Sequence, residues 1–528
     1  MIVIIGTGPS GVAVARPLIA TGAPVLWLDA GDHYNRVTLP AQPYDAIAPG
    51  SPLSRLVIND MAVAGGNDSP KLRAPSIHGL LWPNDRHPAI STDNFRLVGS
   101  FTAGGLSNAW GAMVASYSQA ELGIDRPTWD GIADAYRALA AEIGISGPRA
   151  SPSTTVDTVL CDVDSLQDPL PLDAPVDALF ARYVAAGANG GPAHLGRPYQ
   201  ALLTSEHASR PACDRRLMCL WGCSRGSVYS ARYSLSELAQ AQNVDYRPNH
   251  RVTAIQRQQD GRFALSVDAV GRIETVMADR VILAAGAPQS VALTLDCARP
   301  ENATTRILST PSFASVLIAP AQLGRTAQRT GYSMAQLSWS TGGADPVSGA
   351  IYATDGLPMS EIARHFPLTR RGSALFGQAL ISAMMPVNGF LSSDYSDNRA
   401  ELLRDSHGTA TLKITGAHTT TALATARAAI RDLAATARAC GAMMIPGSFR
   451  MVGPGADIHY GGGLPMAQEK GPASPLQTDA LGQLGALPGL HIVDGAVLPR
   501  LTSAHPTFTM MANARRIGKA IASRLQGS

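Results

Sequence analysis

Charged and aromatic residues are both scarce in this 528-residue chain, at 16% and 5%. The 43 basic residues nearly balance the 40 acidic ones, and the basic residues occur only as scattered pairs. A nucleic-acid partner would need a basic patch, so none is expected. The longest apolar stretch, at residues 281–295, is interrupted before it reaches the roughly 20 residues of a membrane span. We therefore expect neither nucleic-acid binding nor a membrane span.

Cysteine is also rare, with six residues spread too widely for a disulfide framework in a chain of this length. The first five residues read as a buried strand rather than as a secretory signal. Hydrophobic residues make up 45% of the chain, which is enough for a large core. The sequence therefore predicts a cytoplasmic enzyme.

A glycine-rich turn near the start carries the first chemical signal. Residues 2–5 and 25–28 predict strands, and residues 11–20 predict a helix between them. The turn between the first strand and the helix has the pattern GxGxxG, which lets a pyrophosphate approach the helix N-terminus. Asp29 follows 18 residues after Gly11, where a carboxylate can accept hydrogen bonds from a ribose. This combination predicts a dinucleotide site, and a merely tight turn is the alternative.

Another strand that ends in glycine comes some 270 residues later. Residues 280–285 predict a buried strand, and Gly286 follows it. A nicotinamide-binding domain normally completes its sheet within one contiguous unit, whereas a flavin-binding fold commonly returns late in the chain. The late strand therefore favours a flavin as the dinucleotide. The alternative interpretation is an ordinary strand and turn without a cofactor role.

The rest of the chain alternates between regular and irregular segments. Residues 31–95 and 146–196 predict long irregular connections because they are rich in proline, glycine, aspartate and serine. Helices are expected at 130–145, 229–242 and 419–440, strands at 252–257, 263–267, 315–318, 334–340, 349–353 and 409–414, and a strand followed by a helix at 492–525.

Five motifs occur in the order found in the glucose-methanol-choline (GMC) oxidoreductases, namely residues 6–31, 99–111, 284–290, 459–463 and 493–509. The chain thus resembles a bacterial FAD-dependent member of that family, although residues 300–450 match only in the general pattern of short strands and helices and not in a specific motif. The resemblance implies an α/β fold in which an FAD-binding Rossmann-like, doubly wound domain is interwoven with a sheet-based α+β substrate domain. The implied boundaries are 1–300 for the FAD-binding domain, with lid and loop insertions at about 32–95 and 146–228, then 301–450 for the substrate domain and 451–528 for the return to the first domain.

The resemblance also implies FAD as the cofactor of this flavoprotein. Relatives with covalently bound flavin have a histidine before the tryptophan in the loop 99–111, whereas Ala109 precedes Trp110 here, which indicates noncovalent FAD. Asp494 matches a position near the ribityl chain, and the helix after Pro506 would direct its N-terminus at the flavin, with Thr507 and Thr509 supplying capping or flavin contacts. The cofactor-binding residues implied in this way are Gly6, Gly8, Ser10, Gly11, Asp29, Ala30, Gly31, Gly99, Gly104, Gly105, Ser107, Asn108, Ala109, Trp110, Val252, Ala285, Gly286, Asp494, Gly495, His505, Pro506 and Thr507.

His459 and His505, 46 positions apart, match the catalytic pair of the family. One histidine can take an alcohol proton near neutral pH while a hydride passes to flavin N5, and the second can orient the oxygen. The resemblance thus implies alcohol oxidation at a CH–OH group of a sugar, polyol or specialised metabolite, with oxygen, a quinone or a protein as electron acceptor. The run Tyr460-Gly-Gly-Gly463 departs from the family pattern and predicts a more flexible backbone beside His459.

Two further functions stay open at this point. A redox-neutral isomerase, lyase or cyclase could use the same flavin pocket, and an inert dinucleotide-binding scaffold would need neither histidine. Cys213, Cys219 and Cys223 lack the spacing of a zinc or ferredoxin site, so no metal is expected. They predict a packed loop of free thiols near the flavin, with a redox-active pair as an alternative. Substrate, oligomeric state and the choice between oxidase and dehydrogenase do not follow from the sequence.

Overall fold

The computed structural model describes residues 1–31, 89–149, 159–187, 190–300, 303–325, 330–354, 379–467 and 474–527, together with residues 81, 157 and 377. Single positions inside these ranges, 162, 218, 220, 221 and 224, are outside the description. The insertion expected at about 32–95 therefore lies mostly outside the described residues.

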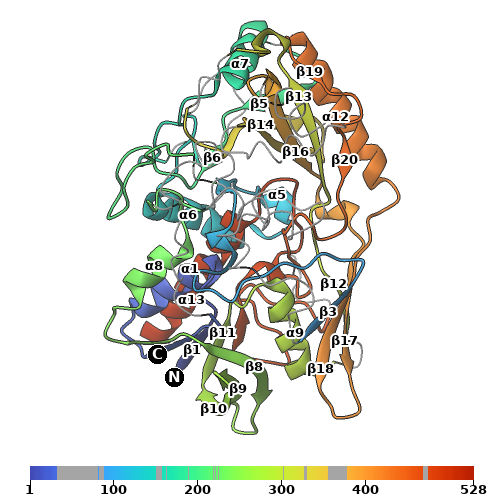
Figure 1. Ribbon diagram of the computed structural model, residues 1–528. Coiled ribbons are helices and arrows are strands. Elements are labelled where there is room, and N and C mark those ends of the chain that lie inside the picture. The colour runs from blue at the N-terminus through green and yellow to red at the C-terminus, as the bar shows by residue number, and fades with distance from the viewer. Residues whose placement is uncertain are drawn as a thin grey trace, which may run out of the picture.

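A five-stranded parallel sheet lies in the lower part of the molecule (Figure 1). The strand order is β21-β11-β1-β2-β7, so strands from both ends and the middle of the chain lie side by side. The central strands β1 and β2 are short apolar runs, IVII and VLWL, because both faces of the sheet are covered there. The strands are β1 (Ile2–Ile5), β2 (Val25–Leu28), β7 (Val244–Arg247), β11 (Arg280–Leu283) and β21 (Leu490–Ile492).

Alternate residues of β1, β2 and β11 enter two different cores. Ile4 of β1 packs with helices α1 (Pro9–Ile19), α6 (Arg126–Ile143) and α13 (Thr507–Gln526). Ile5 packs on the opposite face with α9 (Ala287–Ala298) and an antiparallel sheet of β8 (His250–Arg257), β9 (Phe263–Ala269) and β10 (Arg272–Ala278). The sheet is thus a middle layer that places every strand end at one edge.

A seven-stranded sheet forms the upper part of the molecule (Figure 1). Its main path is β19-β13-β16-β15-β14-β5, and β20 pairs with β13. Helices α7 (Ala174–Ala186) and α12 (Ala422–Ala439) cover one face of this sheet through a core that includes Trp339 and Leu433. The strands are β5 (Ala193–Gly196), β13 (Ser312–Ile318), β14 (Ala335–Thr341), β15 (Ser348–Tyr352), β16 (Met384–Phe390), β19 (Met443–Met444) and β20 (Arg450–Met451).

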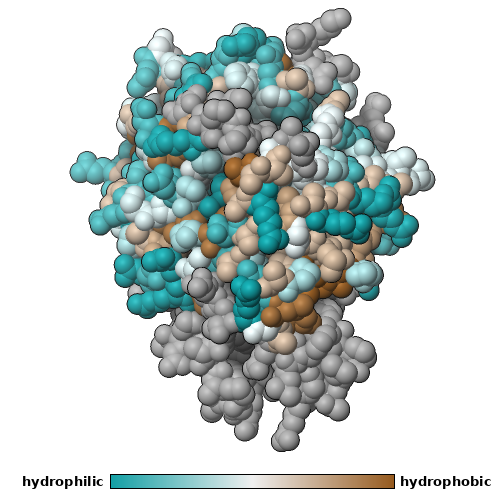
Figure 2. Space-filling model, turned by 90° about the horizontal axis from the view of Figure 1, so that it is seen from above, coloured by the Kyte–Doolittle hydropathy of each residue, from teal (hydrophilic) through white to brown (hydrophobic). Residues whose placement is uncertain are grey.

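Smaller elements connect the two sheets. A four-stranded sheet with the order β12-β17-β18-β3 contains β12 (Thr304–Arg306), β17 (Arg399–Arg404), β18 (Ala410–Thr415) and β3 (Ile90–Asp93). β4 (Met113–Val114) and β6 (Tyr199–Gln200) form an antiparallel two-stranded sheet, and the short helices are α5 (Gln119–Leu122) and α8 (Ala231–Leu238). Hydrophobic and hydrophilic residues are interspersed on the face seen from above in Figure 2.

Most expected elements are confirmed within a few residues, among them β1, β2, β11 and α12. The expectation of an irregular segment at 146–196 is wrong for residues 174–186, which form α7. Aspartate precedes this helix and proline lies in its first turn, so a proline that predicts a loop in isolation begins a helix here. Moreover, β5 joins the upper sheet by pairing with β14, although the sequence placed its residues in a lid of the first domain. The domain boundaries themselves stay a prediction.

Candidate active site

Thr7 joins three of the predicted cofactor motifs. Its backbone N–H and hydroxyl donate to the Asp29 carboxylate at 2.7 and 2.6 Å, and the Gly104 N–H donates to the Thr7 hydroxyl at 3.0 Å. Gly31 adds a further N–H to Asp29 at 2.7 Å. Burial raises the pKa of Asp29, and these hydrogen bonds oppose that rise. The turn 6–11, the strand end at Asp29 and the loop 99–111 therefore form one hydrogen-bonded unit.

The glycines of this unit leave no room for side chains where backbones meet. A Cβ on Gly6 would lie 2.4 Å from the Ala284 carbonyl oxygen, and a Cβ on Gly11 would lie 2.2 Å from the Gly6 oxygen. By contrast, a Cβ on Gly8 meets no atom within 4 Å, so there is open space in front of α1. The helix begins there without a side-chain cap. An uncapped helix N-terminus beside open space suits a pyrophosphate, so these residues fit the implied FAD.

The loop 99–111 lies on the N-terminal end of α8. Ser107 accepts the Ala231 N–H at 2.9 Å, and Asn108 accepts the Ser230 hydroxyl at 2.7 Å. Trp110 donates its indole N–H to the Tyr229 carbonyl at 2.7 Å. The side chains of this loop thus hold it to the protein. Its backbone at Gly105, in the 3₁₀ turn Gly105–Asn108, faces Gly8, since a Cβ there would lie 3.6 Å from the Gly8 Cα.

Asp494 joins the two strand-end motifs of the second half of the chain. Its carboxylate accepts hydrogen bonds from the Gly286 N–H at 2.9 Å, the Ser290 hydroxyl at 2.5 Å and the Ala496 N–H at 3.0 Å. The carboxylate thereby links the N-terminus of α9 to the turn that follows β21. Burial raises the pKa of Asp494. Both acidic residues of the predicted cofactor site thus lie at the carboxyl ends of parallel strands.

The two predicted catalytic histidines lie next to each other in the folded chain. The ring centroids of His459 and His505 are 5.4 Å apart in an edge-to-face arrangement. Phe390, at the end of β16, lies 4.9 Å from the first ring and 5.4 Å from the second. Burial lowers the pKa of His459 to about 3 and that of His505 to about 4, and the neighbouring His505 lowers that of His459 further. Both imidazoles are therefore neutral near pH 7, as a proton acceptor must be.

A polar chain leads away from His459. Its Nδ1 lies 2.8 Å from the Thr310 hydroxyl, which lies 3.1 Å from Oδ2 of Asp457. The same Oδ2 accepts the backbone N–H groups of Thr310 at 2.8 Å and His459 at 3.2 Å. Burial raises the pKa of Asp457 to about 7, against the effect of these hydrogen bonds. Sequence reasoning missed Thr310, Asp457 and Phe390. Asp457 could have been noticed as a carboxylate two residues before a candidate base.

The glycine run after His459 is closely packed. Gly461 exchanges two backbone hydrogen bonds with Leu308, at 2.7 and 3.0 Å, and the Gly462 N–H donates to Gly495. The hydroxyl of Tyr460 accepts the Val98 N–H at 3.0 Å. A Cβ on Gly463 would lie 2.4 Å from Val291. The structure therefore does not show the more flexible backbone that was expected beside His459. Glycine is needed here because the backbone approaches its neighbours closely and adopts positive φ angles.

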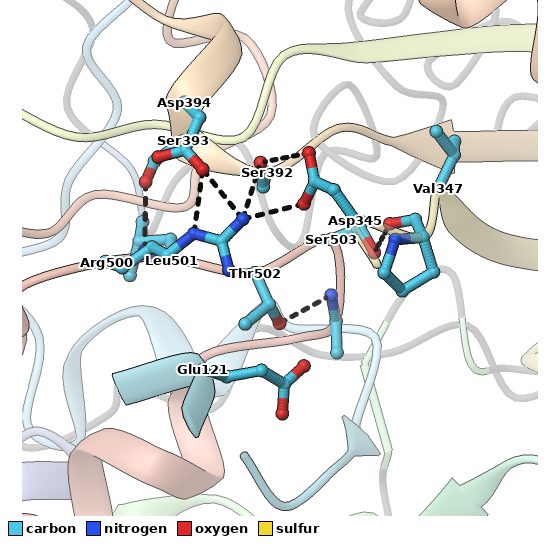
Figure 3. A network of polar contacts seen from close by, with 12 residues as sticks. Glu121, Asp345, Val347, Ser392, Ser393, Asp394, Arg500, Leu501, Thr502 and Ser503 are labelled. Carbon is cyan, nitrogen blue, oxygen red and sulfur yellow. Dashed lines mark hydrogen bonds and ion pairs between the residues drawn. The ribbon is translucent and has the colours of Figure 1, made fainter. Parts of the chain in front are cut away.

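The turn before His505 is fixed by a charged network (Figure 3). Arg500 donates to Asp394 at 2.9 Å and to Asp345 at 2.7 Å. Leu501 exchanges hydrogen bonds with Ser393, and Ser503 donates to the Pro346 carbonyl at 2.7 Å. These partners belong to the upper sheet and its connections, so the network holds the His505 turn against the predicted substrate domain.

One expected role changes. Thr509 is fully buried, and its hydroxyl lies 2.7 Å from the Tyr136 hydroxyl. Because α13 has no side-chain cap, the expected capping by Thr507 or Thr509 is wrong, whereas a flavin contact of either residue stays a prediction. The Val252 side chain is buried in the core beneath the sheet, while the adjacent backbone of Asn249 and His250 bonds to Gly31 and Asp29. The other predicted cofactor residues lie at the strand ends, at the starts of α1 and α13 and in the loop 99–111, and the roles of all of them, that of Val252 included, stay predictions.

The cysteine-rich loop borders the loop 99–111. Cys219 and Cys223 line a small pocket together with Asn108, Trp110 and Arg232. All six cysteines lie among the described residues and are free thiols, and burial raises the pKa of Cys213 to about 12. Over the described ranges, no group of His, Cys, Asp and Glu side chains is arranged to hold a metal ion. None of the helices in the described part of the chain has the length and apolarity to cross a membrane.

Comparison with known proteins agrees with this architecture. Residues 394–514 match the family described as GMC oxidoreductase. The crystal structure of pyridoxine 4-oxidase from Mesorbium loti superimposes with a TM-score of 0.59 at 15% identity, covering 100% of this chain and 99% of that one. None of the curated proteins matches the sequence. These findings confirm the resemblance to the GMC oxidoreductases and the mixed α/β fold class, and they support FAD-dependent oxidoreduction.

Proposed function

We propose that this protein is an FAD-dependent alcohol oxidoreductase that oxidises a CH–OH group of a small molecule, with His459 as base and His505 as its partner. The observation that carries the proposal is the contact between two neutral histidines, which both also contact Phe390. One of them, His505, lies two residues before α13 begins. The turn 6–11, Asp29, the loop 99–111 and Asp494 would hold the FAD. Ala109 before Trp110 supports noncovalent binding.

Bound FAD would supply the hydride acceptor. The alcohol loses one proton from oxygen and one hydride from carbon, which leaves a carbonyl group. His459 takes the proton, because a neutral imidazole offers a lone pair at one ring nitrogen. His505, within 5.4 Å between ring centroids, donates a hydrogen bond that holds the substrate oxygen. Phe390 shields both rings from water and offers an apolar surface to the substrate.

The substrate class we propose is a sugar, polyol or specialised metabolite, and pyridoxine joins it because the similar structure is that of a pyridoxine 4-oxidase. Phe390 favours a substrate with a flat or apolar face beside its hydroxyl group. The electron acceptor is oxygen, a quinone or a protein. We also propose a cytoplasmic location and the division into two domains at about residues 300 and 450.

The test is an anaerobic visible spectrum of the purified protein before and after addition of sugars, polyols, primary and secondary alcohols and pyridoxine. Bleaching of the oxidised-flavin bands is expected with one of these substrates in the wild type, and its rate should fall at least about a hundredfold in His459→Gln and His505→Ala. A flavin spectrum that no alcohol changes would favour redox-neutral chemistry. A protein that binds no FAD after reconstitution would remove the cofactor assignment.

A further inference from the structure

A buried carboxylate is connected to the proposed base through a single hydroxyl group. Thr310 is fully buried, and its hydroxyl lies between Nδ1 of His459 at 2.8 Å and Oδ2 of Asp457 at 3.1 Å. A threonine hydroxyl has one proton to donate and accepts at its lone pairs. The direction in which this proton points therefore decides which partner must be the donor.

Oδ2 of Asp457 is an acceptor for three donors. Two of them are backbone N–H groups, from Thr310 and His459, which can only donate. The third is the Thr310 hydroxyl. An ionised carboxylate has no proton to give, so it draws the hydroxyl proton toward itself. The threonine oxygen then presents a lone pair to His459.

That lone pair requires a proton on Nδ1 of His459. A neutral imidazole carries one ring proton, so Nε2 is left with a free lone pair. The reverse orientation, in which the threonine donates to Nδ1, would put the proton on Nε2 and remove the proton acceptor. The hydroxyl direction thus selects between an active and an inactive tautomer of the same neutral ring.

We propose that Asp457 and Thr310 are positioning residues that hold His459 in the tautomer with Nδ1 protonated and Nε2 free to accept the alcohol proton. The inference rests on the proposed function, because it names the geometry that would make His459 a base. Neither residue needs to touch the substrate. Their effect on the reaction passes entirely through the ring of His459.

The experiment is ¹⁵N NMR of the FAD-reconstituted protein labelled at the histidine rings, recorded above neutral pH. The chain has 12 histidines, and loss of one signal pair in His459→Gln assigns this ring. In the wild type, Nδ1 should show the shift of a protonated nitrogen and Nε2 that of an unprotonated one. Thr310→Val should shift the ring toward the opposite tautomer or a mixture, whereas Thr310→Ser should retain the wild-type pattern.

The kinetic counterpart uses whichever alcohol bleaches the flavin. Thr310→Val should lower kcat by about ten- to a hundredfold, since general base catalysis as a whole contributes about 10²–10⁴-fold, with KM little changed. Thr310→Ser should restore most of kcat. Thr294→Val is the matched control, because Thr294 is equally buried and its hydroxyl has no hydrogen-bond partner among the described residues.

The two proposals fail in different ways. A His459 ring with the proton on Nε2 in the wild type, or a ring whose signals are the same in Thr310→Val, would overturn the tautomer proposal even if alcohols reduce the flavin. Conversely, the NMR result can agree with the proposed tautomer while no alcohol reduces the flavin. In that case the proposed alcohol oxidation is wrong, and the proposed role of Asp457 and Thr310 is retained. Flavin absorbance and circular dichroism of each variant exclude misfolding as the cause.

Discussion

Thr7 shows how one small residue supports a whole predicted cofactor site. It satisfies the buried Asp29 carboxylate and the Gly104 N–H at the same time. Thr7→Val removes both hydrogen bonds and leaves buried polar groups without partners, so the free energy of unfolding should fall by about 1–3 kcal/mol. FAD affinity should fall with it. Urea unfolding and FAD titration measure the two effects, and Thr7→Ser, which keeps the hydroxyl, should stay close to the wild type in both.

The ionisation of Asp457 predicts the pH dependence of the reaction. With a pKa of about 7, the carboxyl takes a proton as the pH falls through neutrality, and the Thr310 hydroxyl is then free to turn toward His459. Within the described ranges, the residues that hydrogen-bond to the Asp457 carboxylate are Thr310 and His459, and His459, with a pKa of about 3, stays neutral over this range. The rate of flavin reduction should therefore rise from acid pH to a plateau above about 7.

Stopped-flow reduction across this pH range measures the profile. Asp457→Asn should have a lower plateau and no step near pH 7, because the amide does not titrate. A step near pH 7 that persists unchanged in this variant would assign the titration to another group.

Some residues of the candidate site can be identified from the sequence alone, and others cannot. His459 and His505 were found because they lie in motifs of fixed order and spacing. Thr310 was not, because it lies 149 positions before His459 in the chain and meets it only in the folded protein, and nothing around it in the sequence is distinctive. Contacts of this kind depend on tertiary structure, which local patterns do not carry.

At the scale of elements, the glycine run after His459 is a rigid connection. Gly463 has a φ of 100°, and an added Cβ would overlap Val291 of α9. Gly463→Ala should therefore lower the free energy of unfolding by about 2 kcal/mol or more. Gly485→Ala is the control, because a Cβ there meets no atom within 4 Å, and it should be nearly neutral. Chemical denaturation of both variants gives the comparison.

The charged network around the His505 turn predicts a separate effect on catalysis. Arg500→Met keeps the length of the side chain but removes its hydrogen bonds to Asp345 and Asp394, at a cost of about 2 kcal/mol. The turn should then place His505 less accurately, so kcat should fall while FAD still binds. Arg399→Met serves as control, because the Arg399 side chain is 70% exposed and lies 4.0 Å from its acidic neighbour. Equal losses of kcat in the two variants would contradict this role.

Elements with strong local patterns were predictable, and those defined by their neighbours were not. Strands β1, β2 and β11 are short, mostly apolar runs, and their positions were found from the sequence. Strand β16 contains Pro386 and Gly389, which argue against a strand. It forms because β13 and β15 pair with it on both sides, and Gly389 fits between Phe313 and Trp339. Tertiary pairing outweighs intrinsic propensity there.

For the molecule as a whole, the proposed cofactor should be a large part of its stability. The implied site joins the turn 6–11, the loop 99–111 and the strand ends near Asp494, so bound FAD would contact segments that unfolding separates. FAD at a hundred times its dissociation constant should add about 2.7 kcal/mol to the free energy of unfolding. Thermal unfolding with increasing FAD measures this, and a midpoint that does not move with FAD would argue against a site in the folded state.

The same arrangement sets the order in which the protein can be completed during synthesis. Helix α13 covers α1, and Arg515 donates to the carbonyl of Ala13, 502 residues earlier in the chain. At about 5–20 residues per second, the first helix waits roughly 25–100 s on the ribosome for the partner that buries its apolar face. Strand β11 likewise waits for β21. The nascent chain therefore leaves the apolar faces of α1 and β11 without these partners until β21 and α13 have been made.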